Sequence, residues 1–147
     1  MRWPLAVVLP FLALPGCGQF GLEPIDPAID GRLTITPQAT TNFGELMPGE
    51  ESKFENFVLA PQGQENPIDV EDVWLEGDTG AFTIGVEPSV PRRLNPGQQF
   101  GVRVRFRPSR AGAYSANFVA VTGTGEEVRR TMRGDGCKDR DDNDRCD

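Results

Sequence analysis

FGVRVRFRP, residues 100–108, is the stretch of sequence that decides the fold. Its large apolar side chains stand at every second position from Phe100 to Phe106, with glycine or arginine between them. Successive side chains of a β-strand point to opposite faces, so this period of two predicts a strand with one apolar face. Pro108 lacks a backbone N–H and ends the pattern. The segment therefore predicts a strand that covers a core.

Six further segments with strand character lie on either side of this one. They are residues 32–36, 52–60, 68–75, 82–86, 114–120 and 128–132. Turn residues separate the segments, and the alternation breaks at Glu71-Asp72, which predicts a β-bulge. With 17 glycines and 13 prolines in 147 residues, a helical protein is disfavoured. We predict an all-β chain folded as an antiparallel β-sandwich of about seven strands.

The composition excludes several classes of function. The chain has no histidine, which excludes Ser-His-Asp and Cys-His catalysis and histidine-based metal sites. Its 15 lysines and arginines are outnumbered by 22 aspartates and glutamates, giving a net charge of −7. An acidic chain without a series of base-stacking aromatic residues is not expected to bind nucleic acid. Adjacent carboxylates such as Glu126-Glu127 lack the facing geometry that glycoside cleavage requires.

The N-terminus has the features of an export signal. Arg2 precedes the apolar run Leu5–Leu14, whose ten residues are too few for a bilayer-spanning helix of roughly 20. The sequence Leu14-Pro15-Gly16-Cys17 that follows resembles the lipobox of bacterial lipoproteins. This resemblance implies that residues 1–16 are a cleaved signal peptide. The alternative is an ordinary secretory signal that is cut nearby.

The lipobox resemblance also implies where in the cell the protein is located. Cys17 is expected to carry the lipid, including a palmitate-type acyl chain, and to anchor the chain in the membrane of a bacterial cell envelope. Gly18 in place of aspartate is compatible with transfer to the outer membrane. Residues 17–31 then form a lipidated tether, rich in glycine and proline. In the alternative interpretation Cys17 is a structural thiol.

A set of motifs along residues 32–136 resembles the ASH group of immunoglobulin-like domains, which is related to major sperm protein and PapD sandwiches. The motifs are Phe43-Gly44, Pro48-Gly49, Val73-x-Leu75-x-Gly77, Leu94-x-Pro96-Gly97, Val102-x-Val104-x-Phe106-x-Pro108, Gly112-x-Tyr114 and Gly134-Asp135-Gly136. The resemblance implies an immunoglobulin-like sandwich that acts as an interaction or structural module, with no catalytic residues to carry over. The motif at Tyr114 predicts either a tyrosine corner or a plain tyrosine at the edge of the core.

Arginines supply the first candidate binding patch. Arg103, Arg105 and Arg107 share one face of the predicted strand, and Arg129 and Arg133 are in phase on a later segment. One interpretation is a cationic patch for phosphate, lipid A or another polyanion. The other, which we favour, is a solvated face on which the arginines form cross-strand pairs with carboxylates.

Trp74 is the second candidate binding residue. It stands between Val73 and Leu75, so it is expected to face away from the core. An exposed tryptophan on a sandwich can stack on a sugar ring or anchor a protein partner. Coverage by the tether or by a neighbouring loop is an equal alternative.

The third candidate lies in the acidic tail, residues 137–147. Lipidation of Cys17 leaves Cys137 and Cys146 as a disulfide pair in an oxidising compartment. Within that ring, the side chains of Asp139, Asp141 and Asn143 match the first ligand positions of a calcium loop. The glycine and the final glutamate of such a loop are missing, so a solvating acidic tail is the default interpretation.

These observations predict a non-catalytic, lipid-anchored envelope protein whose domain binds or spaces other surface components. No cofactor is expected, and the partners are the membrane and an envelope or surface protein. The first alternative is a Ca²⁺-dependent surface adhesin that uses the acidic tail. A small carbohydrate-acting enzyme on a β scaffold is the least favoured hypothesis.

Overall fold

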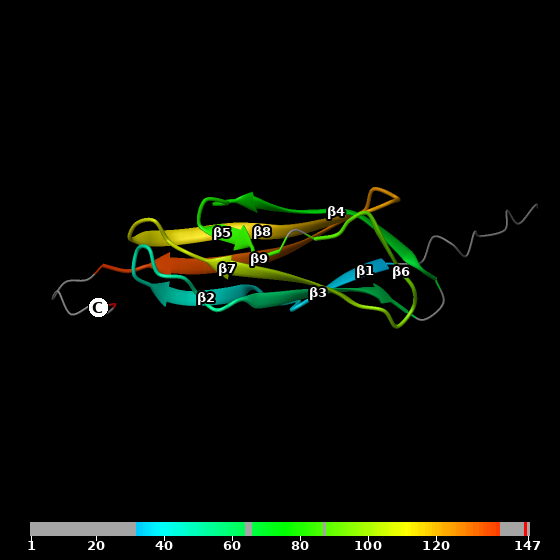
Figure 1. The fold of residues 1–147 in the computed structure, drawn as a ribbon, viewed down its shortest axis with the longest axis horizontal. Helices are drawn as coiled ribbons and strands as arrows, with labels where there is room; N and C mark the ends of the chain where they lie inside the picture. Colours follow the sequence, from blue (N-terminus) through cyan, green and yellow to red (C-terminus); the bar gives the residue numbers. More distant parts are fainter. Residues whose placement is uncertain (1–31, 64–65, 87, 139–145, 147) are drawn as a thin grey trace, which may run out of the picture.

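The computed structural model describes residues 32–63, 66–86, 88–138 and 146. In this part the chain forms two β-sheets packed face to face (Figure 1). The four-stranded sheet has the order β1 (Arg32–Thr36), β3 (Glu55–Gln62), β7 (Phe100–Phe106) and β5 (Phe82–Ile84). The five-stranded sheet has the order β2 (Thr41–Leu46), β9 (Glu127–Gly136), β8 (Gly112–Thr122), β4 (Ile68–Gly77) and β6 (Arg92–Leu94). The predicted all-β sandwich is confirmed.

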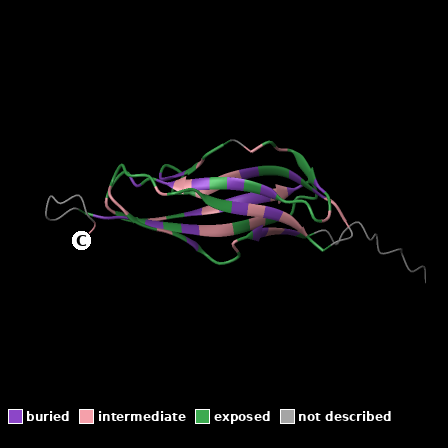
Figure 2. Ribbon diagram, turned by 60° about the horizontal axis from the view of Figure 1, so that its bottom comes forward, coloured by how far each residue is buried: buried purple, intermediate pink, exposed green. Residues whose placement is uncertain are grey.

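The core fills the space between the two sheets. Buried and more exposed residues alternate along several strands, as the colours of the ribbon in Figure 2 show. On β7 the apolar positions of residues 100–106 are buried, whereas Gly101 and Arg103 are exposed. Aromatic rings join the two layers: Phe57 of β3 stacks on Phe118 of β8 with ring centroids 4.8 Å apart. The segment on which the fold prediction depends therefore lies in the structure as expected.

The strand inventory differs from the prediction at three places. The described residues contain nine strands rather than about seven, because β2 and β6 lie outside the predicted segments. β2 pairs with β9 in parallel, so the sandwich is not purely antiparallel. β5 ends at Ile84 instead of continuing to Val86: Gly85 donates a hydrogen bond to the carbonyl oxygen of Arg103 (2.9 Å), and the chain then leaves the sheet.

The irregularity predicted at Glu71-Asp72 is present in β4. The register of β4 against β8 shifts between Val70 and Asp72, which is the signature of a bulge. Because of this extra residue, Val70 and Val73 both point into the core although they are three positions apart. The bulge therefore sets which face of the sheet Trp74 occupies.

Two glycines of β9 allow close packing at one end of the sandwich. A Cβ atom at Gly134 would lie 2.6 Å from the ring of Phe106, and one at Gly136 would lie 2.0 Å from the carbonyl oxygen of Arg110. Real Cβ atoms essentially never come within 3.0 Å of another heavy atom. The Gly134-Asp135-Gly136 motif is thus a requirement of packing.

Tyr114 of β8 forms a tyrosine corner next to these glycines. Its hydroxyl donates a hydrogen bond to the carbonyl oxygen of Arg110 (2.9 Å) and accepts one from the N–H of Arg110 (3.0 Å). The ring packs edge-on against Phe106, with centroids 5.6 Å apart. Of the two interpretations of this motif, the tyrosine corner is correct.

Within the described residues, no helix is long and apolar enough to cross a membrane.

Candidate functional site

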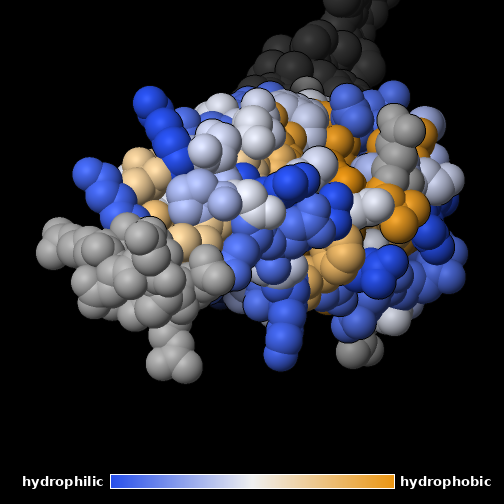
Figure 3. Space-filling view, turned by 60° about the vertical axis from the view of Figure 1, so that its left-hand side comes forward, coloured by the Kyte–Doolittle hydropathy of each residue, from blue (hydrophilic) through white to orange (hydrophobic). Residues whose placement is uncertain are grey.

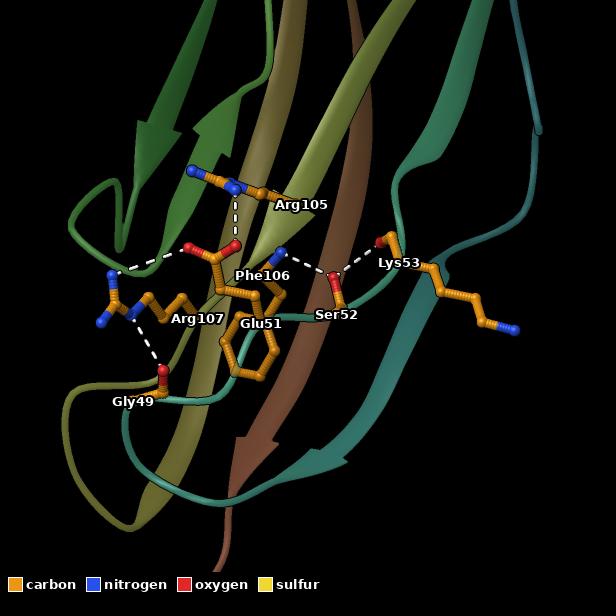
Figure 4. A network of polar contacts seen from close by, with 7 residues as sticks. All are labelled: Gly49, Glu51, Ser52, Lys53, Arg105, Phe106 and Arg107. Atoms are coloured by element: carbon orange, nitrogen blue, oxygen red, sulfur yellow. Dashed lines mark hydrogen bonds and ion pairs between the residues drawn. The ribbon is translucent and has the colours of Figure 1, made fainter.

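The arginines of β7 lie on the outer face of the four-stranded sheet, where they meet one carboxylate. Arg105 Nη1 lies 2.5 Å from Glu51 Oε2, and Arg107 Nη1 lies 3.6 Å from Glu51 Oε1 (Figure 4). The Nε–H of Arg107 also donates to the carbonyl oxygen of Gly49 (3.0 Å). The two guanidinium groups therefore share one carboxylate, which compensates one of their two positive charges.

The segment that carries Glu51 is fixed to β7 through its backbone. Ser52 donates its N–H to the carbonyl oxygen of Phe106 (2.8 Å), and its Oγ accepts a hydrogen bond from the N–H of Phe106 (2.8 Å). The same hydroxyl donates to the carbonyl oxygen of Lys53 (2.7 Å), as Figure 4 shows. The hydrogen bonds of Ser52 thus hold Glu51 beside the arginines of β7.

The other two predicted arginines do not join this patch. Arg129 and Arg133 belong to β9, which lies in the five-stranded sheet, whereas β7 lies in the four-stranded sheet. Outward-facing side chains of the two sheets point to opposite sides of the sandwich. A single cationic surface of all five arginines does not form.

Trp74 lies half-buried on the outer face of the five-stranded sheet, as its position in the sequence predicts. Its Nε1–H donates to Oε1 of Glu76 (3.1 Å), and Glu76 Oε2 accepts from Nε of Arg129 (3.4 Å). Arg129 Nη2 also lies 2.5 Å from Oε2 of Glu127. Val119 of β8 lies between these two residues in the sheet, opposite Trp74 of β4 on one side and Arg129 of β9 on the other. It faces outward and is nevertheless fully buried.

These contacts shift the ionisation of the charged members. The hydrogen bond from Trp74, and then the neighbouring Arg129, hold the pKa of Glu76 below its usual value of 4.5. Hydrogen bonds to Glu127 and Glu76 raise the pKa of the Arg129 guanidinium. The Trp74 indole is therefore oriented by a chain of charged groups at neutral pH.

A third surface feature was not identified as a site from the sequence. Phe54, just before β3, is 43% exposed, and Val86, just after β5, is 64% exposed. The guanidinium carbon of Arg103 lies 5.3 Å from the centroid of the Phe54 ring, and that of Arg105 lies 5.6 Å from it. The sequence predicted instead that Val86 faces the core, because Phe82, Ile84 and Val86 continue the period of two.

Carboxylates in the described residues lie at the surface. The buried polar side chains of this part are Thr41 and Thr122.

One open hollow of about 450 Å³ has Asp78, Tyr114, Ser115 and Arg133 among its lining residues. The carboxylate of Asp78 already accepts a hydrogen bond from the N–H of Ser115 (2.8 Å). The face drawn in Figure 3 is dominated by hydrophilic side chains, with hydrophobic ones in smaller areas between them.

The two tail cysteines are joined in a disulfide, with an S–S distance of 2.04 Å. Cys137 is buried, its N–H donates to the carbonyl oxygen of Leu46 (3.0 Å), and its Sγ lies 3.5 Å from Sδ of Met47. The predicted calcium ligands Asp139, Asp141 and Asn143 lie outside the described residues, as does Cys17.

The sequence matches no protein-family model and no curated protein. Solved structures do resemble the fold. An ASH/PapD-like domain of human CEP192 (PapD-like domain 7) has a TM-score of 0.57 and 12% identity, covering 95% of this chain and 99% of that one.

Two larger proteins contain a similar domain. The secreted serine protease VesC from Vibrio cholerae gives a TM-score of 0.55 at 17% identity, over 74% of this chain and 23% of that one. A family 123 glycoside hydrolase from Clostridium perfringens gives 0.51 at 9% identity, over 68% and 23%. The chain spans about a quarter of each, so these likenesses concern one part of each protein. At such identities the likeness shows the fold alone, and this chain has the ASH/PapD-like type of immunoglobulin fold.

Proposed function

We propose that this chain is a non-catalytic, lipid-anchored protein of a bacterial cell envelope, whose immunoglobulin-like domain is a binding or structural module. The observation that carries the proposal is the distribution of polar groups over the described residues. Most charged side chains lie on the outer faces of the sheets, several as ion pairs, and Arg130 donates a hydrogen bond to the carbonyl oxygen of Ile35 in the other sheet. The buried side chains of this part are apolar apart from Thr41 and Thr122. A sandwich of this kind offers flat surfaces to a partner.

The same distribution argues against a carbohydrate-acting enzyme. Glycoside cleavage uses two carboxyl groups that face each other across the bond, one of them usually with a raised pKa. Among the described residues no carboxylate is buried, and Glu76, the one carboxylate with a resolved shift, has a lowered pKa. We therefore favour binding over hydrolysis.

The anchor is proposed from the lipobox-like sequence that ends at Cys17. Two or more acyl chains, at about 0.8 kcal/mol per buried CH₂, hold a protein stably on a membrane. Growth with a clickable palmitate analogue should label the native chain and leave the Cys17→Ser variant unlabelled. Equal labelling of the two would contradict the anchor. Gly18 supports delivery to the outer membrane, which fractionation of the labelled protein tests.

The binding role has a separate test. The protein is cross-linked in intact envelopes and purified, and the stoichiometry of any bound surface protein is measured. A partner in a fixed ratio is expected, and its loss on substitution of outer-face residues of one sheet would locate the contact. Hydrolysis of envelope glycans by the purified protein would contradict the proposal.

A calcium-dependent adhesin is the alternative, and the disulfide is the observation that favours it. The Cys137–Cys146 bond closes a ring that contains Asp139, Asp141 and Asn143, whose oxygen atoms suit Ca²⁺. The test is calcium titration up to millimolar concentration, followed by native mass spectrometry and Trp74 fluorescence. No bound ion and no spectral change would remove this alternative, whereas binding lost in Asp141→Asn would support it.

A further inference from the structure

Two large apolar side chains of the described residues are exposed, and one of them rests on the glycine that precedes the other in the chain. Phe54 comes from the segment before β3, and Val86 follows β5. A Cβ atom on Gly85 would lie 2.3 Å from Cε1 of Phe54, so the phenyl ring rests directly on the glycine that precedes Val86. The absence of a side chain at this glycine creates the seat for the ring.

Arginines flank this ring, but they differ in how their charge is compensated. Arg105 lies 2.5 Å from Glu51, whereas no carboxylate of the described residues lies within ion-pair distance of Arg103. The Arg103 guanidinium is exposed and lies over the Phe54 ring. We call Phe54, Val86 and Arg103 the Phe54 patch. It combines an aromatic side chain, an aliphatic side chain and a positive charge that has no carboxylate partner among the described residues.

We propose that the Phe54 patch is a docking surface for an extended segment of a partner protein that carries a carboxylate beside a large apolar side chain. The proposal rests on the binding function proposed above and adds the surface and the partner's chemistry. Aromatic residues and arginine are enriched at protein interfaces and at their energetic hot spots. The charge of Arg103 selects an acidic partner, because the opposite charge steers and orients the encounter.

The patch is also ordered before a partner arrives. Gly85 supports the Phe54 ring from one side, and Arg103 and Arg105 contact it through cation–π interactions. A side chain that is already held in one conformation loses less entropy on binding. The geometry therefore favours recognition at the ring itself.

Other occupants fit less well. A polyanion needs several free cations, but Arg105 and Arg107 share the single carboxylate of Glu51, so Arg103 is the one arginine of this row without a carboxylate partner in the described part, and the net charge of the row falls from +3 to +2. A second copy of the chain, docking through the same patch on both molecules, would bring Arg103 toward its own equivalent. An acidic and apolar segment of another protein satisfies both the charge and the ring.

The test is selection of a displayed library of random dodecapeptides on the purified full-length protein, with the Phe54→Ser variant used for counter-selection. We expect enriched peptides to place Asp or Glu next to Phe, Trp, Leu or Ile. Titration of one enriched peptide should show at least about tenfold weaker binding to Phe54→Ser and to Arg103→Gln, a change of about 1.4 kcal/mol. Circular dichroism and urea unfolding confirm that both variants fold.

A matched pair of alanine variants tests the geometry without removing any group of the patch. Gly85→Ala adds a methyl group where the ring rests and should weaken the peptide several-fold. Gly80→Ala adds one where no atom lies within 4 Å and should leave binding unchanged. Equal affinity of the two variants would contradict the role of the seated ring.

Three results would overturn the proposal. The first is enrichment of basic or uncharged peptides, or of peptides that bind Phe54→Ser as well as the native protein. The second is binding of polyphosphate or anionic lipid vesicles that Arg103→Gln abolishes and Phe54→Ser does not, which would indicate an anion site. The third is a peptide lost in Trp74→Ser alone, which would reject this surface while the proposed binding function stands.

Discussion

Replacement of Gly134 by alanine should destabilise the sandwich, because the new methyl group has no space in the structure. Its Cβ would lie 2.6 Å from Phe106 Cε1 and 2.8 Å from two further ring atoms. To reach 3.0 Å the ring must retreat by 3.0 − 2.6, about 0.4 Å, and an ordinary contact of 3.4 Å requires about 0.8 Å. Phe106 is fully buried and packs against the rings of Phe43, Phe82 and Tyr114, so it has little freedom to move.

Overpacking of a core costs typically about 1–3 kcal/mol, and the enclosure of Phe106 places this change in the upper half, at about 2–3 kcal/mol. Gly136→Ala should cost at least as much. There the obstacle is the backbone oxygen of Arg110, which must move by 3.0 − 2.0, about 1.0 Å, and which also accepts the hydrogen bond of Tyr114. Gly80→Ala is the matched control, since no atom lies within 4 Å of its added carbon.

Urea unfolding, monitored by circular dichroism and tryptophan fluorescence, gives the free energy of unfolding of the three variants, and thermal unfolding gives their melting temperatures. For a domain of this size a loss of 2–3 kcal/mol lowers the melting temperature by about 8–12 °C. The control should stay within about 0.5 kcal/mol of the native protein. If Gly134→Ala were as stable as Gly80→Ala, the close contact between β9 and Phe106 would be wrong.

Three further predictions follow from contacts described above. Tyr114→Phe keeps the ring but removes both hydrogen bonds to Arg110, so urea unfolding should report a loss of about 1–2 kcal/mol, and unchanged stability would contradict the corner. Phe57→Ala should cost about 3–5 kcal/mol, because the ring is fully buried and stacked; a cost below about 1 kcal/mol would contradict this packing. The pKa of Glu76 is lowered on folding, so its stabilising contribution is present above about pH 4.5 and is lost as the pH falls through the folded-state pKa. The Trp74 fluorescence, taken as the difference from Trp74→Phe, should shift in that range, and the shift should disappear in Glu76→Gln.

Local structure could be predicted from the sequence where apolar and polar residues follow a clear pattern along one strand. The period of two in residues 100–106 identified β7, and the broken alternation at Glu71-Asp72 identified the bulge. β2 was missed because Gly44 interrupts its sequence and its partner is the distant β9, reached in parallel. β6 has three residues, too few to show a period.

The candidate sites were harder to predict because they depend on which sheet a strand joins. Arg103 and Arg129 look equivalent in the sequence, yet β7 and β9 lie in different sheets. Of the arginines in the predicted patch, Arg105 and Arg107 pair with Glu51, which precedes β3. A pair between facing strands, Asp69 and Arg93 (3.6 Å) on β4 and β6, lies outside that predicted set. The position of the Phe54 ring depends on the bare backbone of Gly85, far away in the chain, which no local pattern indicates.

The position of β9 has a consequence for how the polypeptide matures. This last strand lies between β2 and β8, so the five-stranded sheet is incomplete until the C-terminal end of the domain has emerged. Such long-range pairing slows folding and keeps nascent chains open. A product truncated before Glu127 would expose the inner edges of two strands and become a substrate for chaperones and proteases. For the export proposed above, the same delay would keep the chain unfolded while it crosses a membrane.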